Sequence, residues 1–550
     1  MGASCRPVRD GMVIRTRSKH LESALQERLV HLRDHQECRI IRLSQEFAAA
    51  EAESSGLVNL EERAEWQFEP RGSLPSIHHD PNSCVRCKAC VDTCNEVQRV
   101  GALSFDEKEG VLFDEKKCTR CGQCILSCPM GFRKMPGVVA KLMGCEPCPF
   151  SRPLGAMREV DDSGKVWEAL KDNDKYVVVQ FAPAVRATLG EEFGMEPGTL
   201  VTGRLYAGLR RLGFKQVWDT NFSADLTIME EGYELIHRLN NGGALPQFTS
   251  CSPGWIRFCE TFYPDLIPNL STAKSPQQML GAVAKTYATE KLNVDPRKMF
   301  VVSIMPCTAK KFERTREELD SAYHYWLEKG TIQKTDHFQD VDVVLTSREA
   351  AKLFKMGRID LATLPEEEHD SLLGQYTGAA PIFGRTGGVM EAALRTAYEV
   401  VTKKPLEKLE FESLGTMDGV KVATISLDGV EVKVAVAHGL ENAKKVCDSV
   451  REGGEFASYH FIEFMACEGG CIGGGGQLIP TNMFFRKART GGVNLDDRHQ
   501  PLRKSHLNPE VEQLYKEFLR EPLGHLSHHL LHTQYVDRSN QAAGVVVSRS

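Results

Sequence analysis

The chain has 550 residues, of which 41% are hydrophobic and 26% are charged, and its formal net charge is -6. This length can build several hydrophobic cores, so we expect a globular protein of two or three main domains. Basic residues are scattered among acidic ones, and no apolar run approaches the roughly 18 residues of a membrane span, so neither a nucleic-acid partner nor a membrane partner is expected.

Residues 1–74 form an N-terminal extension, and within it leucine and isoleucine recur at helical spacing over residues 20–66, which predicts one or two helices. The first residues lack the apolar stretch of a signal peptide, so export is not expected. Residues 1–35 carry more arginine and lysine than acid, which fits either an organellar presequence or a solvated helix. We expect a soluble protein of the cytoplasm or of an organelle matrix.

Eighteen cysteines are many for this length, and most stand in C-x2-C spacings, which indicates metal binding rather than disulfides. Two runs read C-x2-C-x2-C-x3-C, a spacing that puts three thiolates on one tight loop and sends the fourth towards a second cluster. Zinc would leave the middle cysteine of each run unexplained. The pattern predicts a ferredoxin-like domain with two [4Fe-4S] clusters over residues 75–160, held by Cys84, Cys87, Cys90, Cys94, Cys118, Cys121, Cys124 and Cys128.

Basic side chains stand beside both cysteine runs. Such charges attract an anionic redox partner, so we expect a small acidic electron carrier such as ferredoxin to dock there. The residues concerned are Arg86, Lys88, Lys116, Lys117 and Arg120.

From residue 175 onward, apolar β-branched runs alternate with helical segments. The runs predict strands buried on both faces, and therefore an α/β domain with a parallel or mixed sheet. Chemistry is expected where such strands end. The predicted strands cover residues 176–183, 299–306, 340–347, 432–439 and 459–466.

Three short stretches carry the strongest chemical signal: TSCSPGW at 249–255, MPCTAK at 305–310 and EFMACEGGCIGGGGQ at 463–477. In the third, Cys467 and Cys471 stand four apart beside the glycines 473–476, so two thiolates can face one centre while backbone without side chains closes over it. Taken alone, this stretch would also fit a structural cysteine pair or a disulfide.

Together the three stretches resemble the signatures of [FeFe]-hydrogenases, TSCCPxW, MPCxxKxxE and ExMACxxGCxxGGGQ, with Glu313 and Glu463 at the acidic positions. The resemblance runs from about residue 75 to about 537. It implies a catalytic domain of mixed parallel sheets flanked by helices over 161–500. A wrapping segment like the family's small subunit would follow over 501–537, and then a disordered tail over 538–550.

The resemblance implies an enzyme that reversibly reduces protons to H2 with electrons from ferredoxin, and that depends on hydrogenase maturation proteins. Its cofactor would be an H-cluster, a [4Fe-4S] cubane joined to a two-iron subcluster with CO, cyanide and azadithiolate. By position, Cys307 and Cys467 would bind the cubane, Cys471 would be the bridging thiolate, and Pro183 and Met305 would lie beside the cofactor. The fourth cubane ligand of the family is replaced by Ser252.

The family's route for protons is retained by position in this chain. Cys251 matches the proton donor, and Lys310 matches the residue that holds a cyanide ligand. Glu231 and Glu234 lie three apart, so they share a helix face, although a solvated acidic face has the same pattern. The implied relay consists of Glu231, Ser271, Glu234 and, at its outer end, Arg238.

Two further segments contain cysteine or histidine residues outside these motifs. Residues 130–152 resemble an insertion, and their Cys145 and Cys148 fit half a metal site, a tolerated surface loop or an error in the gene model. Residues 514–535 predict one helix followed by a histidine-rich stretch, which we expect to serve packing and surface rather than metal binding.

A noncatalytic relative, such as a redox or H2 sensor or an iron-sulfur assembly factor, is the alternative function. It is suggested by Ser252, whose hard oxygen suits iron-sulfur chemistry poorly. The complete relay favours the enzyme.

Overall fold

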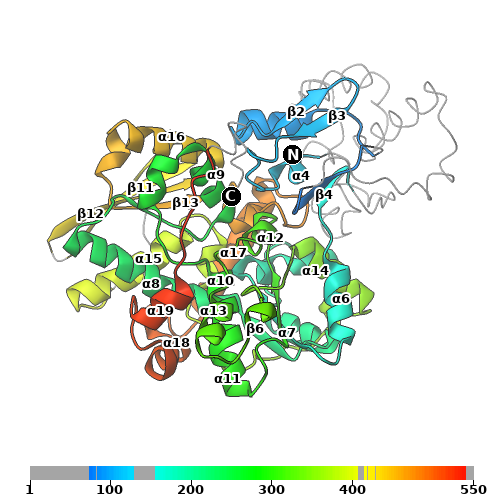
Figure 1. Cartoon of the computed structure of the whole chain (residues 1–550). Coiled ribbons are helices and arrows are strands. Elements are labelled where there is room, and N and C mark those ends of the chain that lie inside the picture. Colours follow the sequence, from blue (N-terminus) through cyan, green and yellow to red (C-terminus); the bar gives the residue numbers. More distant parts are fainter. Residues whose placement is uncertain are drawn as a thin grey trace.

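The computed structural model describes residues 74–81, 83–128, 155–406, 414–417, 419–427 and 429–539. The helices expected before residue 74, the insertion at 130–152 with Cys145 and Cys148, and residues 540–550 of the expected tail lie outside this part. The described residues form two small sheets in the cysteine-rich region and two larger sheets in the body of the molecule (Figure 1).

The cysteine-rich region is the blue part of Figure 1. Strand β1 (Ile77–His79) pairs antiparallel with β4 (Met157–Glu159), so segments before and after both cysteine runs are joined. Strands β2 (Leu103–Asp106) and β3 (Gly110–Phe113) form a hairpin. Helices α3 (Ala89–Asp92) and α4 (Gln123–Ser127) each follow a cysteine loop, which completes a small α+β unit.

The first large sheet has the order β6-β5-β8-β9 and is parallel throughout. Its strands are β5 (Tyr176–Phe181), β6 (Gln216–Asp219), β8 (Met299–Ile304) and β9 (Val343–Leu345). The valines of β5 and β8 are almost fully buried, as expected of a sheet covered on both faces. Helices α6 (Ser163–Lys171), α7 (Thr202–Leu212) and α14 (Ser347–Met356) pack beside it.

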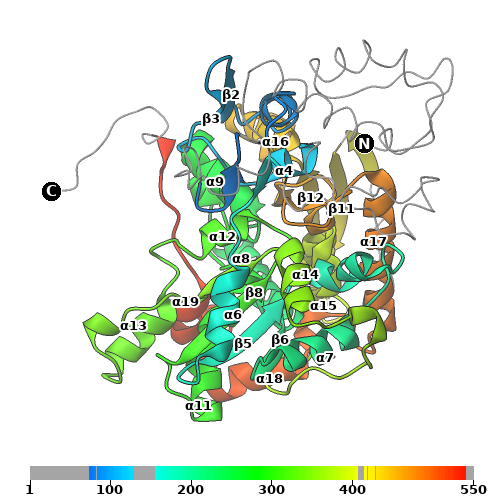
Figure 2. The same cartoon turned by 90° about the vertical axis from the view of Figure 1, so that its right-hand side faces the viewer.

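The second large sheet has the order β10-β11-β12-β13-β7, and Figure 2 shows β11 and β12 as a layer separate from β5, β6 and β8. Strands β10 (Leu414–Met417), β11 (Val420–Leu427) and β12 (Val430–His438) are antiparallel, whereas β12, β13 (Phe461–Met465) and β7 (Gln247–Phe248) are parallel. All five predicted strands are confirmed; four are shorter than predicted, whereas β12 begins two residues earlier and ends one residue earlier than predicted.

The long helix α8 (Thr220–Asn241) packs against α10 (Pro276–Val283) and α15 (Gly388–Thr402). Helix α9 (Pro253–Phe262) follows β7, helix α12 (Ala309–Glu313) follows β8, and α17 (Met483–His499) precedes the C-terminal segment. None of the helices within the described ranges is long and apolar enough to cross a bilayer.

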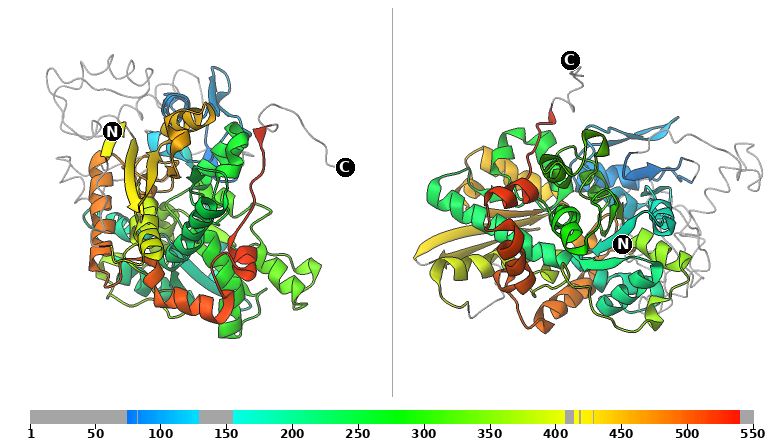
Figure 3. Two further views of the ribbon diagram at one scale, coloured as in Figure 1. Left: turned by 90° about the vertical axis from the view of Figure 1, so that its left-hand side faces the viewer. Right: turned by 60° about the horizontal axis from the view of Figure 1, so that its bottom comes forward.

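The helix predicted at the start of residues 514–535 is confirmed by the helical turn Tyr515–Leu519, which continues a helix that begins before residue 514. Helix α18 (Pro509–Leu514) begins earlier, because Asn508 caps it by accepting hydrogen bonds from the next turn, and the histidines form a helix of their own, α19 (His525–Leu531). Beyond α19 the chain pairs with residues 272–274, where the Thr533 N–H donates to the Thr272 carbonyl over 2.8 Å. Figure 3 shows this red segment leaving α19 along the outside of the body.

Candidate metal centres and active site

The two cysteine runs enclose two separate cavities of about 20 Å³ each. In both, three cysteines come from one run and the fourth comes from the other, as the spacing predicts. The outer cavity is lined by Cys84, Cys87, Cys90 and Cys128, and the inner cavity by Cys94, Cys118, Cys121 and Cys124.

The chemistry of these cavities suits iron-sulfur clusters. Burial raises the pKa of Cys87 and of Cys121 to about 12, so without a metal these thiols keep their protons. Iron supplies the positive charge that a buried thiolate requires. Each cavity is ringed by four cysteines, which is the ligand set of a [4Fe-4S] cluster.

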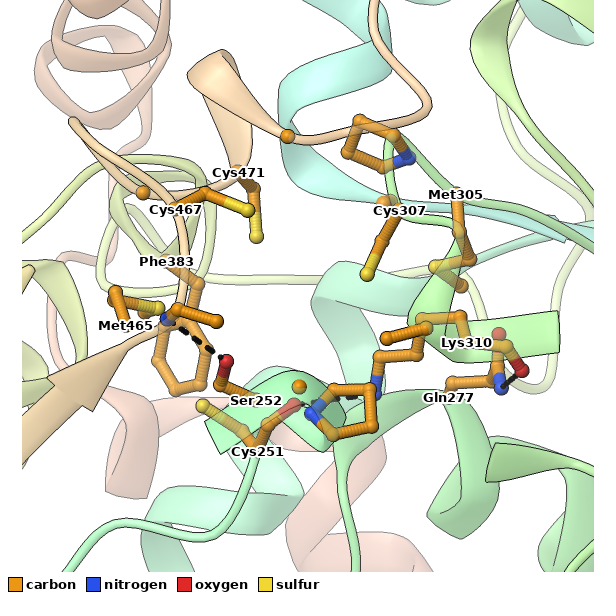
Figure 4. A pocket seen from close by; sticks show the side chains of 18 of the residues that line it. Cys251, Ser252, Gln277, Met305, Cys307, Lys310, Phe383, Met465, Cys467 and Cys471 are labelled. Atoms are coloured by element: carbon orange, nitrogen blue, oxygen red, sulfur yellow. Dashed lines mark hydrogen bonds between the residues drawn. The ribbon is translucent and has the colours of Figure 1, made fainter. Parts of the chain in front are cut away.

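A third cavity of about 80 Å³ lies where strands of both large sheets end (Figure 4). Pro183 follows β5 and Cys307 follows β8, whereas Ser252 follows β7 and Cys467 follows β13. Parallel strands bring their carboxyl ends to one edge, and two sheets meeting at such edges assemble four distant segments around one space. This cavity is larger than the two others and can hold a larger group.

Close packing of the glycine stretch explains its sequence. A Cβ atom on Gly474 would lie 2.0 Å from the Pro306 carbonyl oxygen, and one on Gly475 would lie 2.2 Å from the Cys121 carbonyl oxygen. Only glycine therefore lets this loop touch both the MPC turn and the inner cysteine loop. As a result, Cys121 lines both the inner cavity and the third cavity.

Besides Cys121 and Cys251, three cysteines and one serine at the predicted ligand positions line the third cavity. Figure 4 shows Cys307, Cys467 and Cys471 on one side and Ser252 on the other. The Ser252 Oγ accepts a hydrogen bond of 3.3 Å from the Ala466 N–H, next to Cys467. The donor set fits a cubane with three thiolate ligands and an oxygen atom at the fourth position.

Lys310 and Cys251 lie together on the wall of this cavity. The Lys310 Nζ donates to the Cys251 carbonyl over 3.1 Å and to the Glu313 carboxylate over 3.0 Å. Burial, reinforced by the nearby carboxylate of Glu231, raises the pKa of the Cys251 thiol, and Lys310 opposes this shift. The Cys251 thiol therefore holds its proton at neutral pH, as a proton donor must.

The predicted relay residues are adjacent and buried. The Ser271 hydroxyl donates to Glu234 Oε2 over 2.6 Å, and Arg238 Nη2 donates to Glu234 Oε1 over 2.6 Å. Glu231 is 0% exposed and Glu234 is 8% exposed, which contradicts a solvated acidic face. Burial, and then the charge of Glu234, raises the pKa of Glu231 to about 8, so its carboxyl is largely protonated at pH 7.

Several cavity residues were not identified from the sequence, among them Gln277, Phe383 and Met465. Gln277 Nε2 donates to Glu313 over 3.0 Å, while its buried Oε1 has no partner and is available to a bound group. A polar side chain in an amphipathic helix gives no distinguishing pattern. Met465, in contrast, directly precedes the AC of the third motif and could have been found there.

Arg120 contradicts one expectation. It was predicted to face solvent and attract a redox partner, but its side chain is only 2% exposed. The Arg120 backbone has φ 63°, and the Thr308 hydroxyl donates to its carbonyl over 2.7 Å, so the loop is held against the body and its side chain is enclosed. Arg86 and Lys116 are exposed, as predicted.

Comparisons with known proteins agree with this geometry. The chain matches the C-terminal domain of the iron only hydrogenase large subunit over residues 175–475, the iron hydrogenase small subunit over 483–538 and a 4Fe-4S dicluster domain over 83–132. The NADP-reducing hydrogenase subunit HndD of Solidesulfovibrio fructosivorans is 42% identical over 97% of this chain and 87% of its own length.

Among solved structures, the [FeFe]-hydrogenase HydA1 of Chlamydomonas reinhardtii is similar with a TM-score of 0.60 and 41% identity, over 69% of this chain and 100% of that chain. A weaker similarity, 31% identity over 66% of this chain and 78% of the relative, links it to protein NAR1 of Arabidopsis thaliana.

Proposed function

Because the chain belongs to the [FeFe]-hydrogenase family, an oxidoreductase family that acts on H2, we propose that it reversibly reduces protons to H2 with electrons from ferredoxin. Its cofactors are two [4Fe-4S] clusters and an H-cluster. The observation that carries the proposal is the convergence of Cys251, Cys307, Cys467 and Cys471 on one cavity that Cys121 also lines.

The cavity residues divide into two groups by the chemistry that each offers. Cys307, Cys467 and Cys471, with Ser252 at the fourth position, would hold the H-cluster, which supplies the iron at which protons and electrons combine. Lys310 offers a charge-assisted donor at the same wall, the kind of group that holds an anionic ligand. Pro183 and Met305 bound the cavity on the side of the parallel sheet and help to exclude water.

Protons would reach the cavity through this chain's own side chains. Cys251 would present a proton at its Sγ, and Glu231 would restore it, because the raised pKa of Glu231 lets its carboxyl hold a proton at pH 7. Ser271 and Glu234 continue the line, and Arg238 fixes the outer carboxylate. Ser271, Glu234 and Arg238 are joined by hydrogen bonds, and the Ser250 N–H beside Cys251 donates to Glu231 Oε1 over 3.3 Å, which supports a relay.

The electron donor is proposed to be ferredoxin or a similar acidic carrier, supported by the exposed Arg86 and Lys116 beside the cluster loops. The relative HndD is named as a subunit of an NADP-reducing hydrogenase, so a partner protein of that kind is the competing donor. Maturation proteins would also be partners, since the two-iron subcluster must be inserted. We propose that residues 75–160, 161–500 and 501–537 are the corresponding domains, and the pairing of β1 with β4 supports the first.

A second candidate function is iron-sulfur assembly or sensing without catalysis. The oxygen ligand at Ser252 and the similarity to protein NAR1 favour it. The infrared spectrum of the chain matured with the two-iron subcluster separates the two functions, because CO and cyanide stretches fall where proteins do not absorb. We expect these bands together with H2 evolution; a spectrum without them would exclude the enzyme.

A further inference from the structure

Three guanidinium groups surround the ring of Phe312, where the inner cysteine loop meets the catalytic body. The guanidinium carbons of Arg257, Arg120 and Arg538 lie 4.7 Å, 5.9 Å and 6.0 Å from the ring centroid. They come from α9, from the inner cysteine loop and from the C-terminal segment, and Phe312 belongs to α12. Such a gathering of like charges requires a compensating negative charge.

Protein carboxylates supply little of that charge. Arg257 is 5% exposed, and its guanidinium donates to two backbone carbonyls, Cys118 O at 2.7 Å and Glu115 O at 3.1 Å; within the described residues it forms no salt bridge. Arg120 pairs through one nitrogen with the 65% exposed carboxylate of Glu115, while its buried Nε and Nη1 have no partner among the described residues. Arg538 is paired with Glu260.

Arg120 and Arg257 lie against the ligands of the inner cluster. Arg257 binds the carbonyl of Cys118, and Arg120 stands between Cys118 and Cys121 in the same loop. One arginine is thus part of the ligand loop and the other is hydrogen-bonded to the backbone of that loop.

We propose that Arg120 and Arg257 are the counter-charges of the inner cluster and raise its reduction potential above that of the outer cluster. Four thiolates make such a cluster anionic, and one added electron makes it more negative, so fixed buried cations stabilise the reduced form. Electrons shared by the two clusters would then collect at the inner one, beside the catalytic cavity that Cys121 lines.

The outer cluster lacks an equivalent pair among the described residues. Among the described residues that line its cavity, Lys88 is paired with the exposed carboxylate of Glu107, as Arg120 is with Glu115, but no arginine corresponds to Arg257. Arg86 is exposed and donates to the Glu107 carbonyl, so water and salt screen its charge. The inference rests on the two clusters of the proposed function and is independent of turnover at the catalytic cavity.

The test is a potentiometric titration of the full-length chain, followed by electron paramagnetic resonance, with iron and sulfide measured in every variant. A Cys84→Ser variant assigns the outer-cluster step. In Arg120→Gln and Arg257→Gln we expect the equilibrium constant for reduction of the inner cluster to fall about tenfold, which lowers its reduction potential by about 59 mV for one electron. The reduction potential of the outer cluster should stay unchanged. Arg120→Lys keeps the positive charge, so the reduction potential of its inner cluster should stay close to that of the wild type.

Glu115→Gln should shift the reduction potential of the inner cluster in the opposite direction. Removing its carboxylate takes away the anion that is paired with Arg120, so the inner-cluster equilibrium should rise, by about threefold because the carboxylate is largely exposed and screened. A merely structural role for the arginines would not predict shifts of opposite sign. An inner potential unchanged in Glu115→Gln, or equal shifts of both steps in the arginine variants, would overturn the proposal whether or not the protein evolves H2.

Discussion

The cluster-binding region and the catalytic cavity are built in opposite ways. All eight cysteines of the first lie between residues 84 and 128, and two cavities result, each with a complete ligand set. The second draws its four ligand positions from three segments between residues 252 and 471, and one of the four positions holds Ser252 in place of a cysteine. A local motif specifies its site alone, whereas a site assembled from distant strand ends can lose one ligand while the rest of the protein is unaffected.

The largest effect should come from removing the proton donor. In Cys251→Ala we expect H2 evolution to fall by about 10³-fold, within the range of general acid catalysis, because the other thiols of the cavity would be bound to iron under the proposed assignment. Iron and sulfide content should stay unchanged. Cys259→Ala, which removes a fully buried thiol outside the cavity, is the matched control and should keep full activity. Loss of the cubane in Cys251→Ala would instead identify Cys251 as a ligand.

Ser252→Cys should give the catalytic cavity the fourth cysteine ligand that each of the two cysteine-rich cavities already has. A thiolate binds iron more firmly than an oxygen ligand, so cubane occupancy and H2 evolution should rise together, the rate by about tenfold. Ser250→Cys adds a thiol at a buried site outside the cavity and should produce neither gain. Improved occupancy without activity would favour the noncatalytic function. No change in either quantity would mean that position 252 is not at the cluster.

Glu231→Gln tests whether the relay contains a neutral carboxyl. The pKa of Glu231 is about 8 in the folded protein and about 4.5 in the unfolded chain, so between these pH values the folded protein binds one proton more than the unfolded chain. The stability from this protonation is complete below pH 4.5 and is lost as pH rises through 8. Between pH 5 and 8 the free energy of unfolding of the wild type should therefore fall relative to that of Glu231→Gln, by up to about 1.4 kcal/mol per pH unit. The melting temperatures of the two proteins, measured across this pH range, report the difference.

The same variant should lower H2 evolution by about 10²-fold, since an amide cannot pass a proton onward. Glu230→Gln is not a suitable control, because Glu230 binds His532 over 3.0 Å in the C-terminal segment. Glu317→Gln, outside the relay, serves instead. A pH-independent difference in melting temperature would show that Glu231 is ionised in the fold.

The contrast between a local motif and a site assembled from distant segments also explains which features could be predicted from the sequence. Cysteine spacing and five buried strands were predictable because each depends on neighbouring residues. The short strands β6 and β7 and the β10–β11 hairpin were not predicted, and β7 has only two residues, too few for a periodic pattern. The burial of Arg120 depends on Thr308, distant in sequence, and was therefore predicted wrongly. The pairing of the C-terminal segment beside Ser271, where the Tyr535 hydroxyl donates to the Ser271 carbonyl over 3.0 Å, was likewise beyond local patterns.

The smallest effect concerns the outer surface of the cluster region, where Arg86 and Lys116 remain exposed after Arg120 is excluded. In Arg86→Gln and Lys116→Gln, electron transfer from ferredoxin should slow about threefold at low salt, because long-range attraction steers an acidic carrier to this face. The difference should vanish at high salt, where exposed charges are screened beyond about 3 Å at 1 M. Lys334→Gln, an exposed lysine of the catalytic body, should leave the rate unchanged. Equal rates for all three variants at low salt would move the docking face away from the cysteine loops, and would favour a partner protein held by apolar contacts over a diffusing acidic carrier.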